Sequence, residues 1–378
     1  MSRGLPQGTI KLRPEDFVVD EIPAYEPSGE GPHLYVRFKK TNLTTDEVVK
    51  AFARALRVDR RDIGVAGLKD KVGVTTQWIS ILAEDTSLDE RVAALAIDGV
   101  ELLEQRRHRN KLKTGHLDGN RFTIVVRDID EARAGEVVTA LERIGTEGVP
   151  NAFGSQRFGH DGDTHERARA WLTGKERAPG DPRLRRFHFS ALQSAIFNAV
   201  LAHRVEAGTW NVPILGDLLK KEDTGGVFIC TDVQLDRERA KRGEVCPTGP
   251  IVGDRMRQPE AEAFDLEQRI TMPLIEGIDL RRARSLGEGT RRPLRLRVAE
   301  LSHSLVGTSL HEASSSPVSH GSPGVCAMTV RFVLPKGAYA TTVLSNAFAI
   351  LDAGRPSGSS ERPYEREERQ LATLTEEE

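Results

Sequence analysis

The sequence has little cysteine and no long apolar run. Its three cysteines are too few and too scattered for a disulfide framework or a zinc finger. No stretch approaches the roughly 18 consecutive apolar residues that a membrane-spanning helix needs. The first residues also lack an apolar run of the signal-peptide type. We therefore expect a soluble protein of the reducing cytoplasm that does not enter a membrane.

Cofactor motifs are absent as well. The sequence contains neither the glycine-rich loop that cradles ATP phosphates nor a dinucleotide fingerprint, and it has no Gly-x-Ser-x-Gly nucleophile elbow. Metal-ligating residue types recur as His160, Asp161, Asp163 and His165, but their spacing fits no zinc pattern. We expect no cofactor and no bound metal. A metal-dependent phosphodiesterase that uses these four side chains stays open as an alternative function.

Charge is present but unevenly distributed. The formal net charge is −2, yet residues 105–121 carry six basic residues against one acidic residue, and residues 281–297 carry seven arginines against one glutamate. Such local stripes are typical of surfaces that bind phosphate groups. The alternative is that both stretches are solvated faces with no nucleic-acid partner. If RNA is the partner, Arg106, Arg107, Arg109 and Lys111 are the residues that we expect at its backbone.

Periodicity and turn residues predict a mixed fold of several parts. The Pro/Gly-containing stretch 178–182 predicts a boundary, followed by a separate mixed module to about residue 297. Residues 313–324 are expected to form a flexible loop, and the acidic tail after Gly354 is expected to be disordered. The expected strands are 16–21, 33–39, 74–81, 121–127 and 328–334. One expected helix follows the capping box at 44–47, and another ends near residue 144. Further helices are expected at 164–172, at 190–207 and from Gly337 to about Leu351.

A tight polar loop between two apolar strands contains the first candidate for chemistry. Asp70 lies in it, close after Gly67, with Lys69 and Lys71 on either side. Two neighbouring cations favour the ionised carboxylate, which a nucleophile or a general base requires. The alternative is an ordinary turn aspartate beside solvated lysines.

The second candidate is the glycine-containing segment 151–159. Asn151, Phe153, Arg157 and Phe158 give it amide and guanidinium donors together with two aromatic rings. Such a loop suits stacking and edge recognition of a nucleobase. The alternative is a kinked strand whose aromatic side chains belong to the core.

At these same segments the sequence resembles the TruD family of tRNA pseudouridine synthases. The resemblance implies an α+β fold, in which a pseudouridine-synthase catalytic core of mixed, largely antiparallel sheet and flanking helices is interrupted by an inserted α/β module. The implied parts are the core at 1–177 and 298–353, the inserted domain at 178–297, and an acidic tail at 354–378. The matching segments are residues 11–21, 66–78, 107–112, 119–123, 151–159 and 332–341.

The resemblance also implies an activity and its site. It predicts isomerisation of a uridine to pseudouridine in transfer RNA, most specifically uridine 13 of the D arm, without a cofactor or an obligatory protein partner. Asp70 matches the catalytic aspartate, whereas Lys11 is the nearest match to a basic residue that pairs with it. Phe17, Asn151 and Tyr339 match residues of the base pocket, and Phe153 is of the type that stacks on a base. A non-catalytic RNA-binding protein remains the other alternative.

Overall fold

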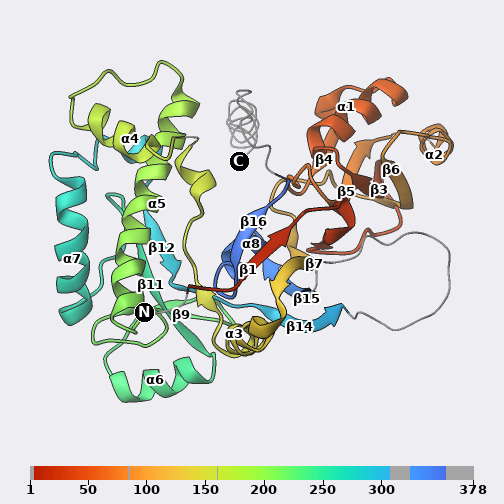
Figure 1. Ribbon diagram of the computed structural model, residues 1–378. Coiled ribbons are helices and arrows are strands. Elements are labelled where there is room, and N and C mark those ends of the chain that lie inside the picture. The colour runs from red at the N-terminus through yellow and green to blue at the C-terminus, as the bar shows by residue number, and fades with distance from the viewer. Residues whose placement is uncertain (1–3, 84–85, 160, 307–323, 355–378) are drawn as a thin grey trace. The chain divides into compact units, whose positions relative to one another are not determined.

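The computed structural model describes residues 4–83, 86–159, 161–306 and 324–354 (Figure 1). The chain divides into two compact units, which we describe separately. The first unit takes in Met1–Thr146 with Val298–Gly358, and the second takes in Glu147–Arg297. None of the helices in the described ranges combines the length and apolarity that a membrane crossing requires.

A ten-stranded sheet forms the centre of the first unit. Its strands run in the order β14-β15-β7-β2-β5-β3-β6, while β4 pairs with β5 and β1 pairs with both β7 and β16. Most pairs are antiparallel, but β2 with β5 and β1 with β16 are parallel. The elements are β1 (Gln7–Ile10), β2 (Phe17–Pro23), β3 (His33–Thr41), α1 (Thr45–Leu56), β4 (Ile63–Val65), β5 (Val74–Leu82), α2 (Ser87–Ala93), β6 (Val100–His108), β7 (Leu117–Asp130), α3 (Ala134–Glu147), β14 (Ala299–Val306), β15 (Val325–Pro335), α8 (Ala340–Leu344) and β16 (Ala349–Asp352).

Helix α1 packs on this sheet next to the loop that contains Asp70. The expected capping box is confirmed, because Thr44 accepts a hydrogen bond from the Glu47 amide and Glu47 bonds back to Thr44. The apolar face of α1 then meets the buried side chains of β3 and β5. This packing fixes the ends of the strands from which the loop projects.

The second unit combines helices with two small sheets. Its four-stranded sheet has the order β10-β9-β11-β12, and β13 pairs with β8. The long helix α5 packs against β11, α4 and α7. The elements are β8 (Val149–Pro150), α4 (Thr164–Leu172), α5 (Pro182–Glu206), β9 (Leu218–Lys221), β10 (Val227–Ile229), α6 (Val233–Lys241), β11 (Val245–Ile251), α7 (Ala261–Ile275), β12 (Thr290–Pro293) and β13 (Arg295–Leu296).

The structure corrects two sequence-based expectations about helices. The stretch 178–182 leads directly into α5, because Asp181 caps the helix through the Arg183 amide and Pro182 suits the first turn. Ser190 therefore lies inside α5 and does not cap it. The helix expected to reach Leu351 ends at Leu344, and residues 349–352 form β16, which supplies the backbone partners that the edge strand β1 needs.

The domain limits that the sequence predicts stay predictions, because the division into two units does not test them. The predicted module 178–297 lies within the second unit, which also takes in residues 147–177. The loop expected at 313–324 lies, except for Gly324, outside the described residues, as does the tail beyond Gly354.

Candidate active site

The Asp70 loop, residues 66–73, leaves the sheet between β4 and β5. These two strands pair antiparallel with Val65 opposite Ile79, so the residues between them must bridge the gap as a broad loop. Gly73 closes the loop with a φ of 134°, and a Cβ atom there would lie 2.5 Å from the carbonyl oxygen of Phe17. Only glycine allows this backbone to come so close to Phe17. The Asp70 side chain, at the tip, is 55% exposed.

Lys11 supplies the cation at Asp70. Its Nζ lies 3.3 Å from Asp70 Oδ2 and 3.6 Å from Asp352 Oδ2. The same ammonium lies 4.4 Å from the centre of the Phe17 ring. Lys11 is only 10% exposed, so water screens its charge less than at an open surface. The arrangement holds one ammonium between two carboxylates and against an aromatic face.

Asp352 is a part of this group that sequence reasoning missed. It reaches Lys11 because β16 pairs in parallel with β1, with Ile10 opposite Asp352. Its Oδ1 also accepts a hydrogen bond from the Gly354 amide at 3.1 Å. The matching motifs end before this strand, so no motif in the sequence indicates that Asp352 lies beside Lys11.

The two lysines that flank Asp70 in the sequence make ion pairs elsewhere. Lys69 Nζ lies 2.7 Å from Glu21 Oε2, and both side chains are buried. Lys71 pairs at 3.4 Å with the exposed Glu47. The expectation that sequence neighbours supply the counter-charge is thus corrected: Lys11, which follows β1 near the start of the chain, makes the ion pair with Asp70.

Phe17 and Tyr339, the two predicted base contacts of the first unit, differ in exposure. Phe17 is buried, and its ring makes an edge-to-face contact with Phe122 at 6.3 Å while Lys11 lies over it. Tyr339 precedes α8 and is 52% exposed. Tyr339 is therefore more accessible to a base than Phe17, which lies beneath the Lys11 ammonium. Contact of either residue with a base stays a prediction.

Asn151, in the second unit, has both ends of its side-chain amide engaged. Its Nδ2 donates to the Pro293 carbonyl at 2.9 Å, and its Oδ1 accepts a hydrogen bond from Arg292 Nη2 at 2.7 Å. Its backbone amide donates to the Leu294 carbonyl at 2.8 Å. The side chain is nearly buried. Arg292 is therefore a further functional candidate. Its position in an arginine-rich stretch of the sequence did not predict the contact with Asn151.

Phe153 is held close to the same arginine. Its backbone amide and carbonyl both pair with the Asn198 side chain at 2.9 Å. The Arg292 guanidinium lies 4.1 Å from the centre of the Phe153 ring, and Phe197 contacts the ring edge-on at 5.5 Å. Phe153 and Arg292 line a cavity of about 280 Å³ that Gln193 also borders. An aromatic ring, guanidinium groups and an amide at one cavity suit a nucleotide.

The basic residues of 105–121 lie on and after the edge strand β6, and each of the four predicted RNA contacts has a partner. Arg106 pairs with Glu104, Arg107 with Asp89, and Arg109 with Glu30, while Lys111 donates to the Arg61 carbonyl at 2.6 Å. Arg106 and Arg109 are exposed, whereas Arg107 is mostly covered. RNA-backbone contact by these four residues stays a prediction, and Arg107 has a structural role of its own.

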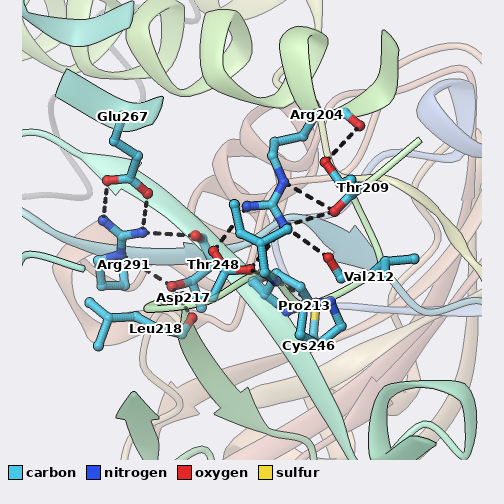
Figure 2. Close-up of polar contacts among 12 residues, drawn as sticks. Arg204, Thr209, Val212, Pro213, Asp217, Leu218, Cys246, Thr248, Glu267 and Arg291 are labelled. Atoms are coloured by element: carbon cyan, nitrogen blue, oxygen red, sulfur yellow. Dashed lines mark hydrogen bonds and ion pairs between the residues drawn. The ribbon is translucent and has the colours of Figure 1, made fainter. Parts of the chain in front are cut away.

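The second basic stretch is divided between the interior and the surface of the second unit. Arg291 makes a paired ion contact with Glu267 and donates to the Thr248 carbonyl at 2.8 Å (Figure 2). Both charged side chains are buried. Arg284 and Arg295 likewise pair with acidic residues, Asp254 and Glu222. Arg291 and Arg295 of this run therefore make internal ion pairs, whereas Arg281, Arg282, Arg284 and Arg297 are exposed.

The His and Asp side chains of the alternative metal-dependent function form no cluster among the described residues. Asp163 and Asp161 accept contacts from Arg167 at 2.9 and 3.5 Å. His160 lies outside the described residues. Across the described ranges, no group of three or more His, Cys, Asp or Glu side chains could hold a metal ion.

Comparisons with known proteins give one consistent result. A family profile described as tRNA pseudouridine synthase D (TruD) matches residues 3–178 and 180–347. The chain is 44% identical over 345 residues to a tRNA pseudouridine synthase D of Anaeromyxobacter sp. (strain Fw109-5), covering 89% of this chain and 91% of the relative. It is 37% identical over 344 residues to a protein of that name from Thermus thermophilus, covering 91% of this chain and 89% of the relative.

A solved structure shows a similar fold. The crystal structure of a putative tRNA pseudouridine synthase D (TruD) from Methanosarcina mazei matches with a TM-score of 0.76 and 25% sequence identity. The match covers 93% of this chain and 95% of that one. The expected α+β fold is therefore confirmed across nearly the whole chain.

Proposed function

Because this chain belongs to the TruD family of tRNA pseudouridine synthases, we propose that it isomerises uridine to pseudouridine in transfer RNA with Asp70 as its catalytic carboxylate. Uridine 13 of the D arm is the proposed target, and the cytoplasm the proposed location. One observation carries the assignment of Asp70: its exposed carboxylate lies at a loop tip, 3.3 Å from the largely buried ammonium of Lys11.

The reaction has simple requirements. The C1′–N1 bond breaks, a C1′–C5 bond forms, and a proton moves from C5 to N1, so neither an oxidant nor a group donor enters. A carboxylate serves this chemistry as a nucleophile between the two bond changes or as the base that accepts the C5 proton. Both roles need an ionised Asp70, and the ammonium of Lys11 stabilises that form.

The target base must leave the RNA stack before Asp70 can act on it. Flipping costs a few kcal/mol, and stacking on an aromatic side chain returns about 1–3 kcal/mol per base. Tyr339 is the exposed aromatic of the first unit's candidates, so we assign the stacking contact to it. Phe17 supports Lys11 from below, and Asn151 and Phe153 contribute to RNA binding from the second unit.

The experiment compares Asp70→Asn with wild type on an unmodified tRNA transcript. Pseudouridine is mapped by carbodiimide treatment and primer extension, which measures both the amount and the position. We expect Asp70→Asn to lower the rate by more than about 100-fold, with tRNA affinity and thermal stability unchanged, because the two side chains have nearly the same shape. Asp62→Asn, a change to another acidic residue of the first unit, is the matched control.

Three outcomes separate the functions. Normal isomerisation by Asp70→Asn would contradict the role of Asp70. A wild-type protein that binds tRNA without forming pseudouridine would favour the non-catalytic RNA-binding alternative. A signal at a uridine other than position 13 would keep the activity and correct the target.

A further inference from the structure

Lys40 is a fully buried lysine directly beneath the Asp70 loop. It lies near the end of β3, opposite Thr75 at the start of β5. Its Nζ donates to the Asp70 carbonyl at 2.8 Å and to the Leu43 carbonyl at 2.5 Å. One ammonium thus joins the main chain of Asp70 to the turn that leads into α1.

Neutral contacts join the same two segments on both sides of Asp70. The Thr45 hydroxyl accepts a hydrogen bond from the Lys69 amide at 3.0 Å. Asn42 and Gly73 pair twice: the Asn42 amide donates to the Gly73 carbonyl at 3.1 Å, and the Gly73 amide donates to Asn42 Oδ1 at 3.3 Å. Residues 40–45 therefore hold the Asp70 loop before and after Asp70, and Lys40 is the charged member of this support.

We propose that Lys40 is a positioning residue for the isomerisation: its buried ammonium fixes the peptide of Asp70, so that the carboxylate keeps its place beside Lys11. The inference rests on the proposed role of Asp70. Hydrogen bonds from a charged donor are about twice as strong as those from a neutral one. Burying an ammonium is costly, and its two carbonyl contacts with these segments offset part of that cost.

Electrostatics makes the role testable by pH. The pKa of Lys40 is lowered to about 8: burial has the largest effect and the charge of Lys69 also lowers it, whereas Asp70 and Glu47 act in the opposite direction. Below pH 8 the side chain is therefore an ammonium, and above it a neutral amine with weaker donors. Activity should fall as the pH rises through about 8, because the hold on the Asp70 peptide weakens.

The test measures kcat and KM for tRNA between pH 6.5 and 9 in wild type, Lys40→Gln and Lys39→Gln. Gln at position 40 offers an amide donor without a charge. Lys39 points to the other face of β3 and pairs with the exposed Glu101, so its replacement removes the same charge without touching the loop. We expect Lys40→Gln to lower kcat about 10- to 100-fold with little change in KM, and to lose the decline above pH 8. Lys39→Gln should keep both wild-type features.

Asn42→Ala tests whether the charge of Lys40 matters, or whether any contact that supports the loop has the same effect. It removes a neutral contact of the same loop, so we expect a lower kcat with the alkaline decline retained. Any ionisation of the substrate is common to all variants and cancels in the comparison. If Lys40→Gln keeps the wild-type profile shape, the proposal is overturned.

The wild-type profile gives a second measurement if Lys40→Gln does not fold. A wild-type kcat that stays constant from pH 7 to 9 would also overturn the role of Lys40. Failure of the proposed function is seen separately, as isomerisation by Asp70→Asn. If Asp70→Asn is inactive and the wild-type kcat does not change with pH, Asp70 keeps its proposed role. Only the proposed role of Lys40 is then wrong.

Discussion

The Asp70 loop of the first unit and the Asn151 loop of the second contrast in how their functional candidates are held. Asp70 keeps its carboxylate exposed, while Lys40, Thr45 and Asn42 fix the main chain around it. Asn151, by contrast, uses both ends of its own amide to hold Arg292 and the Pro293 carbonyl. In the first loop the supports are separate from the reacting group. In the second, the candidate side chain is itself a support.

This difference predicts which substitutions should affect chemistry and which should affect folding. A side chain supported by others can change without loss of structure, whereas a buried side chain with several partners leaves unpaired groups behind when it is removed. The two loops should therefore respond to mutation in opposite ways. The following variants test this contrast, starting from the largest expected effect.

The supports of the Asp70 loop should differ sharply from one another. Lys69→Met leaves the carboxylate of Glu21 buried without its ammonium, so we expect the free energy of unfolding to fall by about 3–5 kcal/mol. Lys71→Met breaks an exposed pair with Glu47 and should cost less than about 1 kcal/mol. Urea denaturation of both variants measures the difference. Equal losses of unfolding free energy in the two variants would contradict the expectation that the buried ion pair contributes more than the exposed one.

Asn151→Ala should act on stability as well as on RNA binding. It removes the donor to Pro293 and the acceptor for Arg292, so we expect a loss of about 1–3 kcal/mol. Asn110→Ala, at an exposed position of the first unit, is the control and should leave the denaturation curve unchanged. If Asn151→Ala is as stable as wild type, the Asn151 side chain is not a structural support, and the proposed difference from Asp70 is wrong.

Lys11→Met should reduce turnover while leaving most of the stability. The change removes the cation beside Asp70 but keeps a long apolar side chain over Phe17, so we expect kcat to fall about tenfold, or about 1.4 kcal/mol. Single-turnover assays measure the rate. Lys11→Arg, which keeps the charge, should retain more activity than Lys11→Met. The reverse order would mean that the shape of Lys11 matters and its charge does not.

Local patterns explain why part of the fold could be predicted from the sequence. The capping box and its apolar spacing identified α1, and the strand patterns identified β3 and β5 together with the loop that precedes β5. These signals need only neighbouring residues. Strand β16 could not be found in this way, because its pairing with the distant β1 decides against continuing the helix.

The site was predictable to the extent that family motifs matched, but its charges were not. Lys69 lies next to Asp70 in the sequence, yet its side chain pairs with Glu21, and Lys11 takes the place at Asp70. Lys40 and Asp352 join the site through strand pairing, which no local pattern reveals. Sequence adjacency indicates which charges are present near a residue, and only the fold decides which of them meet.

The smallest expected effect tests the same contrast on strand β6, where exposed and covered arginines are neighbours. Arg106 and Arg109 are exposed, and RNA phosphates can replace their carboxylate partners. We expect the double change to Gln to lower the slope of log affinity against log salt by about one for each phosphate that is no longer neutralised. Arg107→Gln should instead lower stability, because it removes the ion pair with Asp89 and the bond to the Ala83 carbonyl. Filter binding at several salt concentrations measures the slope, and an unchanged slope in the double variant would place the RNA backbone elsewhere.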